Sequence, residues 1–236
     1  MPVPSIPDRL RNSSTHVLLP VGSESFLDHD VIELDPDVEH HLTRVLRLRD
    51  GEPVSVTDGS GRWRPCRARL HGRNQLQADG DVHVQPERVR FTIASAIPKG
   101  DRVDWLVQKV TELGADRIVL MHAERSAIRW KHERATKQLV RLQRIADEAV
   151  RQSRRVWRCA VEGPVDAVDI LDRAVVAEPG GRPISPADSL VAIGPEGGWS
   201  EVELRRAHDR VTVGGSILRT ETAAVAATTL RMVLDH

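Results

Sequence analysis

From about Val89 onward, the sequence alternates short apolar runs with stretches of helical period, and this alternation most limits how the chain can fold. The predicted helices are PKGDRVDWLVQKVTELGAD, which Gly114 ends, residues 131–153 and TETAAVAATTLRMVL. The predicted strands are VRFTIASAI, RIVLM, VVAEP, SLVAIG and VTVGG. Strands that alternate with helices predict an α/β domain with a mostly parallel sheet that is covered on both faces.

The residues before this alternation predict a small β-rich unit that holds one helix. Asp35 is the expected N-cap of the helix and Pro36 its first residue, and an apolar stripe continues to Leu46. Short strands are predicted at PVSVTDG, RWRPCRARL, QLQA and VHV, between Gly and Asp turns. This pattern is typical of a small barrel, and we expect the two domains to comprise residues 1–84 and 85–236.

The composition limits the class of protein. Cys66 and Cys159 lie far apart with no CxxC pattern, and the ten histidines form no spaced ligand set with them. Neither a disulfide framework nor a metal site is therefore predicted. The N-terminal residues lack a long apolar segment, and no uninterrupted apolar stretch approaches about 18 residues, so we expect neither secretion nor membrane spanning. A cytosolic protein is expected.

The charges sum to zero over the chain but are unevenly distributed. Residues 40–73 carry eight Arg against three acids, and residues 99–158 carry fifteen Lys or Arg against eight acids. Of the 34 cations 30 are Arg, whose planar group suits bidentate phosphate contact. Two interpretations stay open. The basic stretches bind nucleic acid, or they form solvated faces in a chain whose Arg content reflects codon composition.

Between a predicted strand and a predicted helix, SLVAIGPEGGWSEVEL places a loop with three glycines, Gly194 to Gly198. The loop matches neither GxxxxGK[ST] nor GxGxxG. Glu196 would repel a phosphate, whereas the glycines let backbone groups approach a neutral or positively charged ligand. Ser200 and Glu203 form a predicted capping box that starts the next helix. An ordinary strand-to-helix turn is the alternative interpretation.

A second glycine-containing turn lies in GGSILRTETAAVAA, residues 214–227. Arg219 and Glu221 stand at the start of the Ala-rich helix that follows, whose small side chains allow another backbone to approach closely. The sequence leaves two roles open for these charged residues. They form a structural ion pair, or they face a ligand and a substrate.

Five segments occur in order along the chain: HHLTRVLRLRDGEPVSVTDG, KGDRVDWLVQKVTELGADRIVLMHAERS, RLQRIADEAVRQSRR, IGPEGGWSEVEL and ILRTETAAVAA. In this order and spacing they resemble the RsmE family of ribosomal RNA uracil-N3 methyltransferases. The similarity covers nearly the whole chain.

The resemblance implies a fold, a cofactor and partners. The implied fold is a small N-terminal PUA-like β-barrel followed by a SPOUT-type α/β domain with a C-terminal trefoil knot, in a cytoplasmic homodimer. The implied cofactor is S-adenosyl-L-methionine, without a metal. The implied substrate is a uridine of 16S rRNA in the assembled or assembling small ribosomal subunit. The positions that match the family's cofactor loops are Ala177, Glu178, Pro179, Gly194, Pro195, Glu196, Gly197, Gly198, Gly214, Ile217, Leu218 and Arg219.

Methyl transfer to N3 of uridine, the activity that the resemblance implies, sets chemical demands. N3 must lose its proton while donors stabilise the charge that spreads onto O2 and O4. Arg219 is the candidate stabiliser, and Glu221 is a candidate base or orienting group with a surface or capping role as its alternative. Glu112 and Glu148 are candidate supporting groups. The sequence identifies no unique base.

The candidate RNA ligands coincide with the two basic stretches and with the family motifs. They are Arg44, Arg47, Arg49, Lys99, Arg102, Arg125 and Arg129. Two other functions stay open. One is a SPOUT methyltransferase that acts on a ribose 2′-hydroxyl or on tRNA, and the other is an RNA-binding ribosome-assembly factor without catalysis. The complete glycine loops argue against the second.

Overall fold

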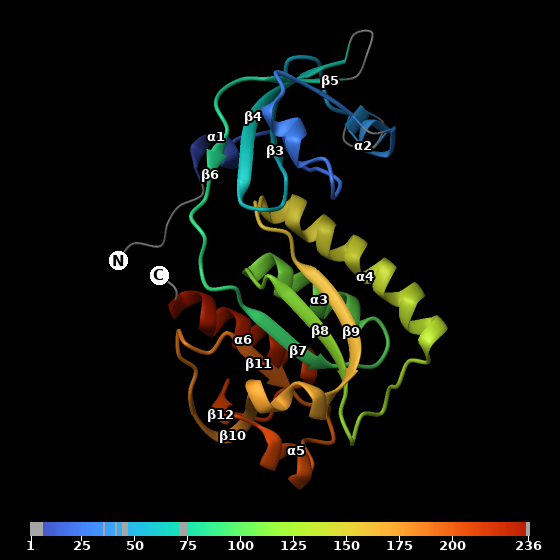
Figure 1. The fold of residues 1–236 in the computed structure, drawn as a ribbon, viewed down its shortest axis with the longest axis vertical. Coiled ribbons are helices and arrows are strands. Elements are labelled where there is room, and N and C mark those ends of the chain that lie inside the picture. Colours follow the sequence, from blue (N-terminus) through green and yellow to red (C-terminus); the bar gives the residue numbers. More distant parts are fainter. Residues whose placement is uncertain (1–6, 35, 41, 44–46, 71–74, 235–236) are drawn as a thin grey trace. The chain divides into compact units, whose positions relative to one another are not determined.

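The computed structural model describes residues 7–34, 36–40, 42–43, 47–70 and 75–234. The described chain divides into two compact units, each with its own sheet (Figure 1). The N-terminal unit extends to Arg88 and also includes Val150–Arg158, and the C-terminal unit comprises Val89–Ala149 and the residues from Cys159 onward. A short later segment thus packs with the first unit. The domain limits 1–84 and 85–236 stay a prediction.

The C-terminal unit contains a six-stranded sheet in the order β12-β10-β11-β7-β8-β9, and every pairing in it is parallel. The predicted parallel α/β sheet is therefore confirmed. Its strands are β7 (Thr92–Ala96), β8 (Arg117–His122), β9 (Ala160–Asp166), β10 (Val175–Pro183), β11 (Leu190–Ile193) and β12 (Asp209–Thr212). Strand β9 is not predicted from the sequence, because AVEGPVD lacks an apolar run and buries only Val161.

The described residues of the C-terminal unit form the helices α3 (Arg102–Leu113), α5 (Glu201–Arg206) and α6 (Thr220–Leu234), most of α4 (His132–Ser153), and the short 3₁₀ helices η3 (Ala167–Asp169) and η4 (Leu171–Arg173). The last turn of α4, from Val150, belongs to the N-terminal unit. The predicted helices are found as α3, α4 and α6. Helix α3 ends at Gly114, whose φ of 124° lies in a region that L side chains rarely adopt. No helix within the described ranges is long and apolar enough to cross a membrane.

Hydrophobic cores lie on both faces of this sheet. Alternate residues of a strand point to opposite faces, so Ile93 of β7 joins one core and its neighbour Ala94 joins the other. The first core contains residues of α3, α4 and α6, and the second contains residues of η3 and η4 together with Trp199. The predicted covering of both faces is confirmed. The trefoil knot that the resemblance implies stays a prediction.

The N-terminal unit contains a sheet in the order β1-β3-β4-β5-β2, with β6 paired to β4. Among the described pairings only that of β1 with β3 is parallel. The sheet packs on a main hydrophobic core, and a smaller buried cluster contains Leu10, Trp63 and Val156. The elements are α1 (Asp8–Arg11), β1 (Thr15–Leu18), η1 (Glu24–Asp28), β2 (Val31–Glu33), α2 (Pro36–His40), β3 (Pro53–Thr57), β4 (Arg62–Arg69), β5 (Gln75–Ala78) and β6 (His83–Val84). The predicted helix begins at Pro36, whereas its expected N-cap Asp35 and residues 44–46 lie outside the described residues.

A buried histidine joins the segment after α4 to the first strand of the N-terminal unit. His16 Nδ1 lies 2.8 Å from Ser55 Oγ, and its Nε2 lies 2.9 Å from the carbonyl oxygen of Arg155. Burial, together with the charges of Arg154 and Arg151, lowers the pKa of His16 from 6.5 to about 4. The ring is therefore neutral near pH 7, so Nε2–H donates to the Arg155 carbonyl and Nδ1 accepts from Ser55.

This depressed pKa predicts a loss of stability in mild acid. Between pH 6.5 and about 4 the unfolded chain binds more protons than the folded chain, so the free energy of unfolding falls as the pH decreases through this window. Protonation of His16 across this window lowers the free energy of unfolding by about 3 kcal/mol. We expect His16→Phe to be less stable at about pH 7 and to lose part of the pH dependence, as measured by urea unfolding across the window.

The matched control is His29→Gln, which changes an exposed histidine of the same unit. This variant should keep the wild-type dependence of unfolding free energy on pH. An unchanged dependence in His16→Phe would contradict the assignment.

Candidate functional site

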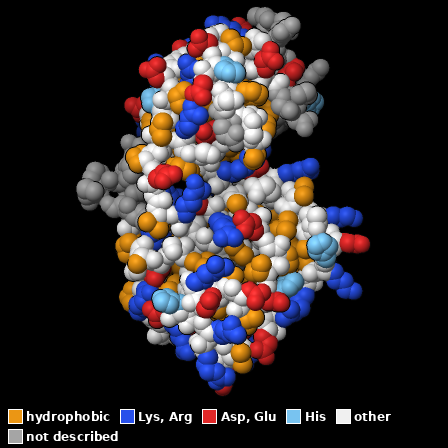
Figure 2. Space-filling view, in the orientation of Figure 1, with side chains coloured by type: hydrophobic (Ala, Val, Ile, Leu, Met, Phe, Trp, Pro, Cys, Tyr) orange, Lys and Arg blue, Asp and Glu red, His pale blue; other side chains and the backbone are white. Residues whose placement is uncertain are grey.

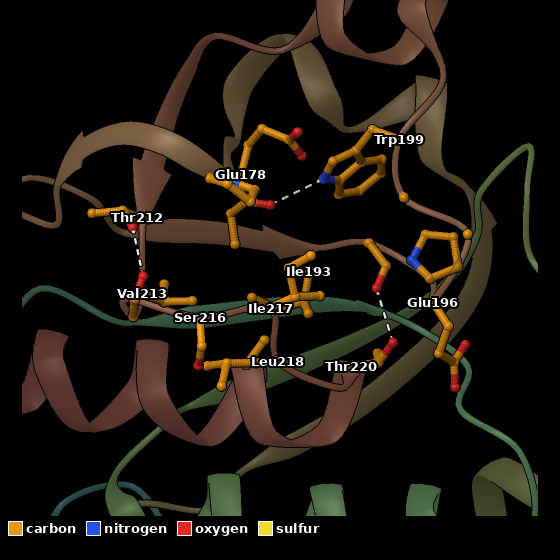
Figure 3. Close-up of a pocket in the computed structure, with 18 residues that line it drawn as sticks. Glu178, Ile193, Glu196, Trp199, Thr212, Val213, Ser216, Ile217, Leu218 and Thr220 are labelled. Atoms are coloured by element: carbon orange, nitrogen blue, oxygen red, sulfur yellow. Dashed lines mark hydrogen bonds between the residues drawn. The ribbon is translucent and has the colours of Figure 1, made fainter.

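A cavity of about 350 Å³ lies where β11 and β12 end and α6 begins, beside the irregular part of β10 that follows Ala177. The carboxyl ends of parallel strands lie at the same edge of a sheet, so loops that are far apart in the sequence meet there. All the residues that the resemblance assigns to the cofactor line this cavity, with the exception of Arg219. Figure 3 shows Ile193 and Ile217 near the middle of the view and Leu218 nearer to α6. The volume suits a small-molecule ligand.

Side-chain to backbone hydrogen bonds hold the walls of the cavity together (Figure 3). Trp199 Nε1 donates to the Ala177 carbonyl at 3.2 Å, which joins the loop after β11 to β10. Thr220 Oγ1 donates to the Gly194 carbonyl at 3.0 Å, which joins the first turn of α6 to the same loop. The Trp199 indole packs so closely on Gly194 that an added Cβ would lie 2.9 Å from Cε2 of the ring. Gly194 is therefore required by packing.

The predicted capping box is confirmed at the start of α5. Ser200 Oγ accepts from the backbone of Glu203 at 3.3 Å, and Glu203 Oε2 accepts from the backbone of Ser200 at 2.9 Å. The other oxygen of Glu203, a buried residue, accepts from the backbone N–H of Glu124 at 2.8 Å. One buried carboxylate thus anchors both the end of the glycine loop and the loop after β8.

The charged side chains that line the cavity are acidic, which disfavours a phosphate ligand. Glu178 and Glu196 carry the only charged side chains of the lining residues, and neither Lys nor Arg belongs to this set. Figure 3 shows Glu178 beside Trp199 and Glu196 at the other end of the cavity. Carboxylates and apolar groups favour a neutral or positively charged ligand over a polyanion. This agrees with the argument made from the sequence of the loop.

The two candidate catalytic residues occupy different environments. Arg219 is exposed, and its side chain makes no hydrogen bond or ion pair with a described residue. Glu221 is buried and lies 3.5 Å from Arg102 Nη1, so its cationic partner is Arg102. An ion pair between Arg219 and Glu221, one of the two roles that the sequence left open, does not form in this structure. Of the candidate supporting groups, Glu112 pairs with Lys109 at 2.7 Å on α3.

The candidate RNA ligands fall into exposed cations and cations that hold the protein's own loops. Arg47, Arg49 and Lys99 are exposed, whereas Arg44 lies outside the described residues. Arg125 donates to the Gly197 carbonyl at 3.3 Å, and Arg129 donates to the Ala123 carbonyl at 2.9 Å. Arg102 pairs with carboxylates. On the face in Figure 2, Lys and Arg side chains are interspersed with Asp and Glu.

Several lining residues are not predicted from the sequence. They are Ile193, Trp199, Thr212, Val213, Thr220 and Ala223. Thr212 lies two positions before a predicted segment, Ala223 lies one helical turn beyond one, and the other four are sequence neighbours of predicted residues. Trp199, which directly follows the glycines, is the sequence feature that could have predicted this side of the cavity, because a buried indole N–H needs a hydrogen-bond acceptor.

Gly194 and Gly215 provide a direct test of the close packing at the cavity. We expect Gly194→Ala to destabilise the protein by about 1–3 kcal/mol, because the indole must move. Gly215→Ala is the matched control, since nothing lies within 4 Å of its added Cβ, and should change stability by less than about 0.5 kcal/mol. Urea unfolding measures both. Equal losses in the two variants would refute the packing argument.

Comparison with known proteins identifies the family. A model of the RNA methyltransferase domain matches residues 85–232, and a model of the RNA methyltransferase PUA domain matches residues 34–76. Ribosomal RNA small subunit methyltransferase E of Mycobacterium bovis is 31% identical over an alignment of 220 residues that covers 84% of this chain and 84% of the relative. The Bacillus subtilis enzyme of the same name is 31% identical over an alignment of 218 residues that covers 80% of this chain and 84% of the relative.

Solved structures support the same relationship. The crystal structure of ribosomal RNA small subunit methyltransferase E from Neisseria gonorrhoeae, bound to S-adenosyl methionine, matches with a TM-score of 0.80 and 28% identity. The match covers 93% of this chain and 97% of that one. The chain therefore belongs to the RsmE family of RNA methyltransferases, with a PUA domain followed by the methyltransferase domain.

Proposed function

We propose that this protein transfers a methyl group from S-adenosylmethionine to N3 of a uridine in 16S rRNA. The observation that carries the proposal is the cavity between β10, the ends of β11 and β12 and the start of α6, whose lining is apolar and acidic. A positively charged cofactor without phosphate suits this lining, whereas a nucleotide phosphate does not. The sequence similarity to ribosomal RNA small subunit methyltransferases supports the substrate class.

The residues of the cavity fit such a cofactor. The glycines of the loop from Gly194 to Gly198 allow close approach of backbone donors and acceptors, and Ile193 with Leu218 offers apolar contact. Glu178 supplies negative charge for a cationic group, and Glu196 lines the cavity while paired with Arg102. When bound, the cofactor supplies a methyl carbon on a positively charged sulfur.

Arg219 is the proposed stabiliser of the transferred charge. The uracil N3–H is a weak acid, and loss of its proton spreads negative charge onto O2 and O4. A guanidinium that donates to these oxygens stabilises the anion, so the proton is released to water and N3 keeps the electron pair of the N–H bond. With that pair N3 would bond the methyl carbon, and the sulfur of the bound cofactor would keep the pair of the broken methyl–sulfur bond and become neutral. Arg219 suits this role because its side chain is exposed next to lining residue Leu218 and has no partner among the described residues.

Glu221 has a supporting role in this proposal. Its carboxylate is buried and lies 3.5 Å from Arg102 Nη1, so a cation of the protein already engages it. We therefore assign it to fixing the first turn of α6, the alternative that the sequence left open.

The proposed RNA contacts lie in both units. Arg47 and Arg49 belong to the N-terminal unit, and Lys99 belongs to the C-terminal unit. All three are exposed cations that are available to phosphate. We also propose, from the family resemblance, a homodimer that acts in the cytoplasm on the assembled or assembling small subunit. Exposed Leu230, Val233 and Leu234 on α6 support an association surface.

The test is methylation of small-subunit RNA with labelled cofactor, followed by mapping of the modified base. We expect Arg219→Ala to lower kcat by about 10²–10³-fold, because it removes a donor to the developing anion. Its Kd for the cofactor, from isothermal titration, should change little, and Arg219→Lys should recover part of kcat.

Arg206→Ala is the control, since Arg206 is an exposed arginine of α5 outside the cavity lining. It should retain the wild-type kcat. Modification of a ribose hydroxyl or of tRNA by the wild-type protein would overturn the proposed substrate atom, and cofactor-independent RNA binding without methylation would overturn the proposed activity.

A further inference from the structure

One guanidinium at the start of α3 serves two carboxylates from different parts of the chain. Arg102 Nη1 lies 3.4 Å from Glu196 Oε1 and 3.5 Å from Glu221 Oε1. Its Nε donates to the Lys99 carbonyl at 3.1 Å, which holds the side chain against the turn that precedes the helix. The sequence had placed Arg102 among the RNA ligands, but its charge is directed into the protein.

Glu221 depends on this cation. Its side chain is only 8% exposed, and a buried carboxylate is costly unless a cation or hydrogen-bond donors compensate it. Glu221 Oε2 is buried and accepts no hydrogen bond from the described residues. Arg102 is the one cation that pairs with Glu221 in the described part of the chain. Loss of Arg102 would therefore leave a buried charge uncompensated.

The three residues connect two walls of the cavity. Glu196 lies in the glycine loop and lines the cavity, while Glu221 follows Thr220, which also lines it. The neutral bond from Thr220 to the Gly194 carbonyl already joins these walls, and Arg102 adds a charged link beside it. Arg219 immediately precedes this first turn of α6, so its position depends on the same anchorage.

We propose that Arg102 is a positioning residue of the methyl-transfer site, which holds the glycine loop and the first turn of α6 together through Glu196 and Glu221. The inference rests on the proposed function for its reaction and adds a role for a residue that does not line the cavity. Its action is indirect, because it places the cofactor loop and Arg219 and binds no RNA phosphate itself.

Arg102→Met and Lys99→Met form a matched pair, since both remove a cation at the start of α3. For Arg102→Met we expect kcat to fall by about 10–100-fold and the cofactor Kd to rise several-fold, with little change in KM for RNA. The slope of log Kd for RNA against log salt should stay at the wild-type value. For Lys99→Met, which removes an exposed cation and proposed RNA contact, we expect the magnitude of that slope to fall by about 0.7–0.9 and KM for RNA to rise, with the cofactor Kd at the wild-type value.

Two further variants separate positioning from simple destabilisation. Arg102→Lys keeps the charge and should recover part of kcat at an unchanged melting temperature. The double variant Arg102→Met with Glu221→Gln removes the uncompensated charge, so it should bind cofactor more tightly than Arg102→Met alone. Amide hydrogen exchange should be faster in residues 194–198 and 220–223 of Arg102→Met than in the wild-type protein.

The outcomes that overturn the inference are distinct from those that overturn the function. A smaller salt slope in Arg102→Met with unchanged kcat and cofactor Kd would identify Arg102 as a phosphate ligand. Wild-type kcat, cofactor Kd and salt slope in Arg102→Met would also overturn the inference. So would strictly additive effects on the cofactor Kd in the double variant. Absence of methylation by the wild-type protein would refute the proposed function. Amide hydrogen exchange in residues 194–198 and 220–223 would still decide whether Arg102 anchors these segments.

Discussion

The parallel pairing of β10 with both β11 and β12 is the constraint on which the site depends. It brings the irregular part of β10 after Ala177 and the loops after Ile193 and Thr212 together at the cavity, although 35 positions separate Ala177 from Thr212. Parallel pairing alone would leave these loops loosely placed. The indole of Trp199 donates to the Ala177 carbonyl of β10, and the hydroxyl of Thr220 donates to the Gly194 carbonyl of the glycine loop. These hydrogen bonds hold the segments around the cavity in place.

The acidic groups that suit a cationic cofactor and the cations that suit RNA phosphate lie at different places in this unit. The lining presents carboxylates, which suit a cationic small molecule and repel phosphate. The cations nearest to the lining are turned toward protein groups, because Arg102 pairs with Glu196 and Arg125 donates to Gly197. Cations for an RNA backbone must come from exposed positions such as Lys99. A protein that binds a charged cofactor and a polyanion in one unit needs such a separation.

The sequence predicts regular elements well where periodicity is strong. Helices α3, α4 and α6 and the buried strands follow from apolar spacing, and the capping box at Ser200 follows from its two residue types. Strand β9 escapes prediction because its side chains are mostly half-buried and its pairing depends on β8. The cavity loops were assigned from family motifs, whereas the pairing of Glu221 with Arg102 depends on tertiary contact between α6 and α3, which no local pattern encodes.

Counting charges along the sequence overstates the surface that is free to bind RNA. In the basic stretch 40–73, Arg62, Arg64 and Arg67 of β4 pair with Asp28, Asp30 and Asp79. All three acids lie outside that stretch, so a window sum counts the arginines and misses their partners. Exposed pairs of this kind contribute little to stability, yet they neutralise the charge that a phosphate would meet. Within the described part of this stretch, Arg47 and Arg49 are the candidate ligands that stay exposed, and they follow α2 in the segment that carries the family motif.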